Sequence, residues 1–134
     1  MTTLKSVHHI NFIVADLDAA VQAYENILGI GPFEYEQLPK RGVSTARVLV
    51  GEVWIVLVSP NSEDSVAGRY LDAHGEGFFL MSFGVDNLDH AIAELAQRGA
   101  VPADRVAHTG ILDWQVADLD TEDSLGVRFH VTQE

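Results

Sequence analysis

The sequence predicts an α+β fold in which two tandem βαβββ modules form facing curved sheets around a central cavity. The first observation behind this prediction is an internal repeat, because residues 8–24 align without gaps with the segment that begins at Phe79. The second is that three strand-like segments follow each amphipathic segment of the repeat. A repeat of this length indicates a duplicated structural unit. The matched positions pair Phe12 with Phe83, Val14 with Val85 and Leu17 with Leu88.

Each copy of the repeat predicts an apolar strand, a cap and an amphipathic helix. Asp16 and Asn87 are the expected N-caps, because their side-chain oxygens can accept hydrogen bonds from the unpaired amides of a first helical turn. Gly29 and Gly99 are the expected helix ends. Apolar residues at helical spacing follow the caps, at Leu17, Ala20, Val21, Tyr24 and Leu28 and at Leu88, Ala91, Ile92 and Leu95.

The remaining strands are predicted from β-branched and aromatic residues between glycines and prolines. A short helix is expected over 64–73, in the polar segment between the two modules. The predicted strands span 33–38, 44–50 and 53–59 in the first module and 105–109, 112–118 and 127–133 in the second.

Length and composition favour a single domain over 1–134, with module one over about 5–60, a linker over about 61–76 and module two over about 77–133. The net charge of −12 comes from 20 acidic and 8 basic residues, and it disfavours nucleic acid and anionic membranes as partners. The chain has no cysteine, which excludes disulfides and thiolate nucleophiles. The absence of a signal-like segment and of a long apolar run predicts a cytoplasmic protein.

Five motifs carry a family resemblance: "HHINFIVADLDAAVQAYENILGIGPF", "VLVSP", "LDAHGEG", "VDNLDHAIAELAQRGA" and "DLDTEDSLGVRFHV". They resemble motifs of the vicinal oxygen chelate superfamily, which includes glyoxalases, methylmalonyl-CoA epimerases, extradiol dioxygenases and bleomycin-resistance proteins. The resemblance covers residues 5–133 and is strongest for the epimerase-like and glyoxalase-like branch. It implies the same fold and a homodimer, while a shared fold leaves the activity open.

Enzymes of this superfamily hold a divalent metal through four side chains, from the first and fourth strands of the two modules. By resemblance these four positions fall on His9, Val56, Leu80 and His130. Valine and leucine cannot donate electron pairs to a metal, and catalytic zinc and iron sites use about three protein ligands. We therefore predict no metal cofactor, and any metal that is bound would involve His9 and His130.

Side chains two residues apart in a strand lie on the same face, so the neighbours of these four positions are predicted to line a small-molecule pocket. The opposite faces of the same strands, with Phe12, Phe129 and Val131, are expected to form core beneath the helices. Alternation also directs His8 away from His9, toward a structural or surface role. The predicted ligand-contacting residues are Asn11, Trp54, Val56, Phe78, Leu80, Ser82 and Arg128.

The two histidines suggest proton transfer. An imidazole exchanges protons near neutral pH, so His9 and His130 could act as base and acid on a carbon acid. Arg128 could hold a carboxylate, enolate or phosphate, although pairing with one of the many acidic residues is a competing interpretation. The first functional hypothesis is an isomerase, epimerase or lyase for a small molecule.

Two alternatives remain open from the sequence. In one, Val56 and Leu80 mark a pocket that binds or sequesters a hydrophobic molecule without catalysis, and the histidines are satisfied structural groups. In the other, a rebuilt ligand set supports divalent-metal glyoxalase or dioxygenase chemistry.

Overall fold

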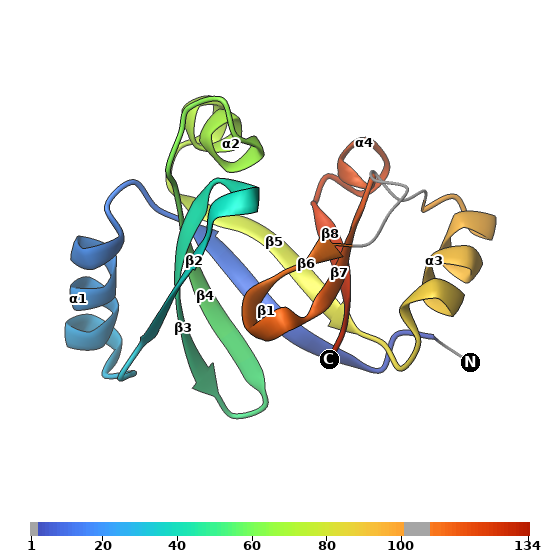
Figure 1. Ribbon diagram of the computed structural model, residues 1–134, viewed down its shortest axis with the longest axis horizontal. Coiled ribbons are helices and arrows are strands. Elements are labelled where there is room, and N and C mark those ends of the chain that lie inside the picture. Colours follow the sequence, from blue (N-terminus) through green and yellow to red (C-terminus); the bar gives the residue numbers. More distant parts are fainter. Residues whose placement is uncertain (1–2, 101–107) are drawn as a thin grey trace. The chain divides into compact units, whose positions relative to one another are not determined.

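The computed structural model describes residues 3–100 and 108–134. Two copies of a β-α-β-β-β order follow each other along the chain, with helix α2 between them (Figure 1). The α+β class and the duplicated βαβββ order are therefore confirmed. The first copy contains β1 (Ser6–Ile13), α1 (Leu17–Leu28), β2 (Glu34–Leu38), the 3-10 turn η1 (Pro39–Arg41), β3 (Val43–Val50) and β4 (Val53–Pro60). After α2 (Val66–His74) come β5 (Gly77–Gly84), α3 (Leu88–Gln97), β6 (His108–Thr109), the 3-10 turn η2 (Ile111–Asp113), β7 (Gln115–Leu119), α4 (Glu122–Leu125) and β8 (Phe129–Gln133).

The internal repeat is visible in corresponding hydrogen bonds. Val14 N donates to Val58 O at 2.9 Å, and its counterpart Val85 N donates to Thr132 O at 2.9 Å. The predicted caps are also confirmed, since the Asp16 side chain accepts from Ala19 N and the Asn87 side chain accepts from His90 N. Each copy therefore leaves its first strand through the same capped turn into a helix.

The described chain forms two compact units. The amino-terminal unit is Ile10–Phe79, and the carboxy-terminal unit combines Met1–His9 with Leu80–Glu134. In the amino-terminal unit the antiparallel strands run in the order β2-β3-β4, and α1 packs on β3 and β4. In the carboxy-terminal unit β5 pairs in parallel with β8, followed by antiparallel β7 and β6, and α3 packs on β7 and β8.

Each unit has its own apolar core between helix and sheet. The first cluster contains Val21 of α1 and Leu57 of β4, with Phe12 packed against it. The second contains Ala91 of α3 and Val131 of β8, with Phe129 packed against it. These positions confirm the predicted alternation, because Phe12, Phe129 and Val131 lie beneath the helices. The polar residues His9, Asn11, Ser82, His130 and Thr132 have the opposite strand parity.

The predicted strand over 112–118 begins too early. A 3-10 turn occupies Ile111–Asp113, and both Leu112 and Asp113 have positive φ, at 51° and 60°. These left-handed conformations are incompatible with a strand, so β7 begins at Gln115. Most of the predicted strand over 105–109 lies outside the described residues, and β6 contains His108–Thr109. The short helix expected over 64–73 is α2, which begins after the cap Ser65.

Among the residues that the structure describes, no helix is long and apolar enough to cross a membrane.

Candidate functional site

The polar face of the carboxy-terminal unit is organised around His130 of β8. The strand register places Ser82 of β5 on one side of His130 and Asp118 of β7 on the other. His130 is 5% exposed, and its Nε2 atom contacts Oδ1 of Asp118. Ser82 is fully buried, and its hydroxyl lies 2.5 Å from the hydroxyl of Thr132. This face therefore carries a buried imidazole that is oriented by a carboxylate.

The contact with Asp118 determines the tautomer of neutral His130. An ionised carboxylate only accepts hydrogen bonds, so Nε2 must carry the proton that it donates to Asp118. The lone pair of the neutral ring is then on Nδ1, where the imidazole can accept a proton. The carboxylate also stabilises the imidazolium that forms when His130 takes up a proton.

His9 of β1 lies in the same unit and is 4% exposed. Its ring stacks on the indole of Trp114, with centroids 5.4 Å apart and planes inclined by 22°. Its Nδ1 atom lies 2.9 Å from Nδ1 of His8. The expectation that His8 points away from His9 is therefore wrong, because the two rings meet edge to face with centroids 5.2 Å apart.

Three of the predicted pocket residues lie on β1, β4 and β5 of the amino-terminal unit. Asn11 is 9% exposed, and its Oδ1 atom is buried without a hydrogen-bond partner among the described residues. Val56 is fully buried, whereas Phe78 is 41% exposed and meets the ring of Phe12 edge to face. Asn11 and Val56 thus contribute a buried amide and a fully buried aliphatic side chain, whereas Phe78 contacts the core residue Phe12.

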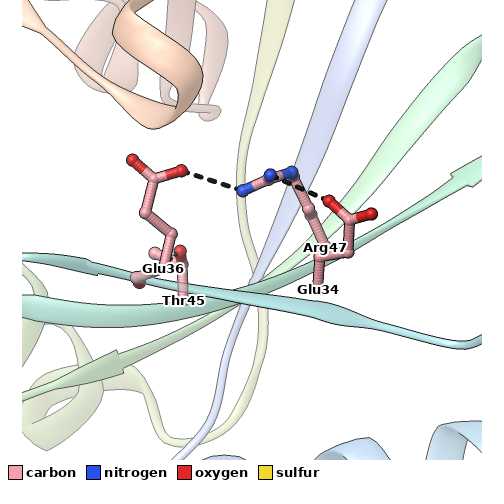
Figure 2. A network of polar contacts seen from close by, with 4 residues as sticks. All are labelled: Glu34, Glu36, Thr45 and Arg47. Atoms are coloured by element: carbon pink, nitrogen blue, oxygen red, sulfur yellow. Dashed lines mark hydrogen bonds and ion pairs between the residues drawn. The ribbon is translucent and has the colours of Figure 1, made fainter.

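Trp54, the fourth predicted residue of this unit, is half-buried and lies beneath a buried arginine. The guanidinium carbon of Arg47 is 5.9 Å from the indole centroid, within the range of a cation–π contact. Arg47 also pairs with two carboxylates of β2, at 2.9 Å to Glu36 and 3.0 Å to Glu34 (Figure 2). At 6% exposure this arginine is among the most deeply placed charges of the unit.

Arg128, the predicted carboxylate clamp, is paired with a side chain of the protein. Its Nη2 atom lies 2.8 Å from Oε1 of Glu122, at the first residue of α4. The side chain of Arg128 is 21% exposed and that of Glu122 is 44% exposed. The competing interpretation of Arg128, an ion pair within the protein, therefore describes the observed contact.

The four positions that correspond to the metal ligands of the superfamily do not fit a metal. Val56 and Leu80 are buried aliphatic side chains at 0% and 2% exposure, and neither has a donor atom. Nε2 of His130 faces Asp118, and Nδ1 of His9 faces His8. Among the described residues, no group of three His, Asp or Glu side chains is arranged to hold a metal ion. The residues present therefore lack the donor set that a catalytic divalent metal needs.

Sequence reasoning missed the partners of both histidines. It gave no role to Asp118, although the alternation in "QVADL" places this residue on the same face as Val116. It gave no role to Trp114, to Arg47 or to Glu134. Alternation could have identified Asp118 and Arg47, whereas the contacts of Trp114 depend on the 3-10 turn before β7.

A protein-family model matches most of the chain. Residues 8–117 match the model described as "Glyoxalase/Bleomycin resistance protein/Dioxygenase superfamily". The chain belongs to this superfamily. The resemblance predicted from the motifs is thus confirmed.

Within the superfamily the chain is similar to methylmalonyl-CoA epimerases. It is 32% identical over 96 residues to the human mitochondrial enzyme, a match that covers 71% of this chain and 54% of that protein. The mouse enzyme is 28% identical over 131 residues, covering 97% of this chain and 74% of that protein. The match therefore spans only about half the length of the human relative.

Solved structures give the same similarity over nearly the whole chain. The epimerase of Streptomyces coelicolor in complex with 2-nitronate-propionyl-CoA has a TM-score of 0.92 and 26% identity, with 98% of each chain covered. The epimerase of Mycobacterium tuberculosis has a TM-score of 0.92 and 25% identity, covering 99% of this chain and 90% of that chain. The fold is therefore that of the epimerase branch.

Proposed function

We propose that this protein is an isomerase that inverts a carbon centre next to a carbonyl group by proton transfer through His9 and His130. The observation that carries the proposal is the buried His130, whose Nε2 atom is held by the Asp118 carboxylate. A carboxylate that orients an imidazole and stabilises its protonated form is a recurring arrangement in general acid–base catalysis. A lyase reaction that begins with the same proton abstraction would use the same two groups.

The chemistry requires two proton-transfer groups. One imidazole removes the proton α to the carbonyl, which leaves an enolate, and the other returns a proton to the opposite face of the same carbon. His130 has its basic lone pair on Nδ1, while His9 supplies the second imidazole from β1. General acid–base catalysis of this kind contributes about 10²- to 10⁴-fold to a rate. A rate increase of this size would distinguish an enzyme from a protein that only binds the same molecule.

An acyl-CoA thioester is the substrate class that we favour. The supporting observation is that similar structures were solved with methylmalonyl-CoA and with 2-nitronate-propionyl-CoA. A thioester carbonyl acidifies the neighbouring C–H bond. A substrate carboxylate on the same carbon would replace the half-exposed Glu122 as the ion-pair partner of the Arg128 guanidinium. The proposed contacts for the remainder of the acyl group within the carboxy-terminal unit are Leu80 and Ser82. Ligand contacts at Asn11, Trp54, Val56 and Phe78 stay predictions.

The proposal includes no metal step. Its support is the chemistry of the donor positions, where Val56 and Leu80 replace two of the four ligands expected from the superfamily. Assembly as a homodimer and a cytoplasmic location stay predictions.

A binding or sequestering protein is the second candidate function. The buried, fully aliphatic Val56 and Leu80 favour it, because neither side chain can hold a metal or transfer a proton. Both candidates predict a ligand, but only the first predicts exchange of a carbon-bound proton with solvent.

The distinguishing experiment uses methylmalonyl-CoA as the probe in deuterated water. Proton NMR should show loss of the C2 proton signal and collapse of the methyl doublet with catalytic amounts of protein. The variant His90→Gln is a matched control, because this histidine lies on α3 with its side chain 74% exposed, and it should exchange at the wild-type rate. Measurable binding of the probe without any deuterium incorporation would contradict the isomerase and support the second candidate.

A further inference from the structure

A continuous chain of polar contacts connects His9 to the surface of the carboxy-terminal unit. The carboxylate of Glu134, which is 61% exposed, lies 2.6 Å from Nε2 of His8. Nδ1 of His8 lies 2.9 Å from Nδ1 of the buried His9. The side chain of His8 is only 12% exposed, so it bridges the exposed carboxylate and the buried imidazole.

Trp114 fixes the orientation of both rings. Its indole meets His8 edge to face with centroids 4.5 Å apart and stacks on His9 at 5.4 Å. Trp114 is itself 5% exposed, and the 3-10 turn before β7 positions it. The contact between the two imidazoles is therefore held by packing in addition to the hydrogen bonds.

A count of protons assigns the roles of the four ring nitrogens. An ionised Glu134 only accepts hydrogen bonds, so Nε2 of His8 must carry a proton. A neutral His8 then has its lone pair on Nδ1. The two facing Nδ1 atoms need one proton between them, and in this state His9 must supply it. Neutral His9 is thereby the Nδ1–H tautomer, with its lone pair on Nε2.

We propose that His8 and Glu134 are positioning residues that hold His9 in the Nδ1–H tautomer and carry the positive charge when His9 accepts a proton. The inference rests on the proposed function, in which His9 is one of the two proton-transfer groups. When Nε2 of His9 takes a substrate proton, its Nδ1 proton passes to Nδ1 of His8. The resulting His8 imidazolium then donates both N–H groups, one to His9 and one to the Glu134 carboxylate.

This arrangement moves the positive charge away from the buried His9 when His9 accepts a proton. An imidazolium enclosed by apolar groups is disfavoured, which weakens a buried histidine as a base. Transfer of the proton to His8 moves the charge to a partly exposed position beside a carboxylate. His9 and His130 would then be supported in the same manner, His130 directly by Asp118 and His9 through one intervening imidazole.

The tautomer is tested by NMR on the full chain, without any substrate. Nitrogen-15 shifts distinguish protonated from unprotonated ring nitrogens, so wild-type His9 should show a protonated Nδ1 and an unprotonated Nε2. In His8→Phe, which keeps the aromatic contact with Trp114 but removes the acceptor, His9 should shift toward the Nε2–H tautomer. An Nε2–H tautomer in the wild type, or the same His9 tautomer in both proteins, would overturn the inference.

The carboxylate is tested by Glu134→Gln, which changes an exposed side chain and leaves the fold intact. Exchange of the methylmalonyl-CoA probe should fall about tenfold in kcat with KM unchanged, because the His8 imidazolium loses the charge of its carboxylate partner. Glu52→Gln is the matched control, an exposed carboxylate in the β3–β4 turn, and should leave the rate unchanged. Equal rates in both variants would contradict the role of Glu134.

The two tests also separate this inference from the proposed function. If the wild-type protein does not exchange the probe but His9 has the expected tautomer that His8→Phe alters, the proposed function fails and the hydrogen-bonded chain stands. If exchange occurs but the tautomer differs, the inference fails alone.

Discussion

Replacement of His130 by glutamine should lower the exchange of the substrate proton about 10³-fold while the protein remains folded. The expected size lies within the 10²- to 10⁴-fold range of general acid–base catalysis. Glutamine retains a side-chain N–H that can donate to Asp118, so the carboxylate keeps a partner, but the amide cannot accept a substrate proton at neutral pH. Deuterium incorporation into methylmalonyl-CoA, with circular dichroism as the check on folding, measures both effects.

Asp118→Asn should lower the exchange rate less than His130→Gln does. It keeps the shape of the side chain but removes the charge that stabilises the His130 imidazolium, and it should reduce exchange about 10²-fold. His90→Gln, on the exposed face of α3, should retain full exchange. An exchange rate in His130→Gln that equals that of His90→Gln would eliminate His130 as a proton-transfer group.

Replacement of Arg47 by methionine should lower the free energy of unfolding by about 3 kcal/mol. The substitution removes a buried cation together with its ion pairs to Glu36 and Glu34, whose side chains are 29% and 71% exposed. The same substitution removes the cation–π contact with Trp54. Urea denaturation of the purified variant measures the loss.

Two further variants show whether charge compensation causes this effect. Glu34→Gln should cost less than about 1 kcal/mol, because the side chain of Glu34 is 71% exposed and such pairs contribute little. The triple variant Arg47→Met, Glu34→Gln, Glu36→Gln should recover part of the loss, because it removes both carboxylates of the ion pairs together with the arginine. If the triple variant is no more stable than Arg47→Met, packing around the arginine accounts for the cost.

The parts of the fold that follow local rules were predictable. Asp16 and Asn87 cap helices because the local sequence places an acceptor before an amphipathic segment, and the repeat places both caps at equivalent points. Phe12 and Val131 pack beneath helices because strand alternation separates the two faces. These features depend on neighbours within a few residues.

The partners of the site depend on contacts between distant parts of the chain, which local rules do not give. Glu134 reaches His8 across 126 residues of sequence. Asp118 faces His130 because β7 and β8 adopt one particular register. Alternation alone directed His8 away from His9, whereas Trp114, placed by the turn at Ile111–Asp113, holds both rings together. The sequence thus indicated the two histidines but not the groups that orient them.

The most direct test of metal-independent proton transfer is deuterium incorporation into methylmalonyl-CoA by protein that has been treated with a chelator, with the metal content of the same sample quantified. Metal-independent proton transfer predicts undiminished exchange by protein that contains far less than one divalent metal per chain, and loss of that exchange in His130→Gln. Exchange that disappears on chelation and returns with added cobalt or another divalent ion would contradict it.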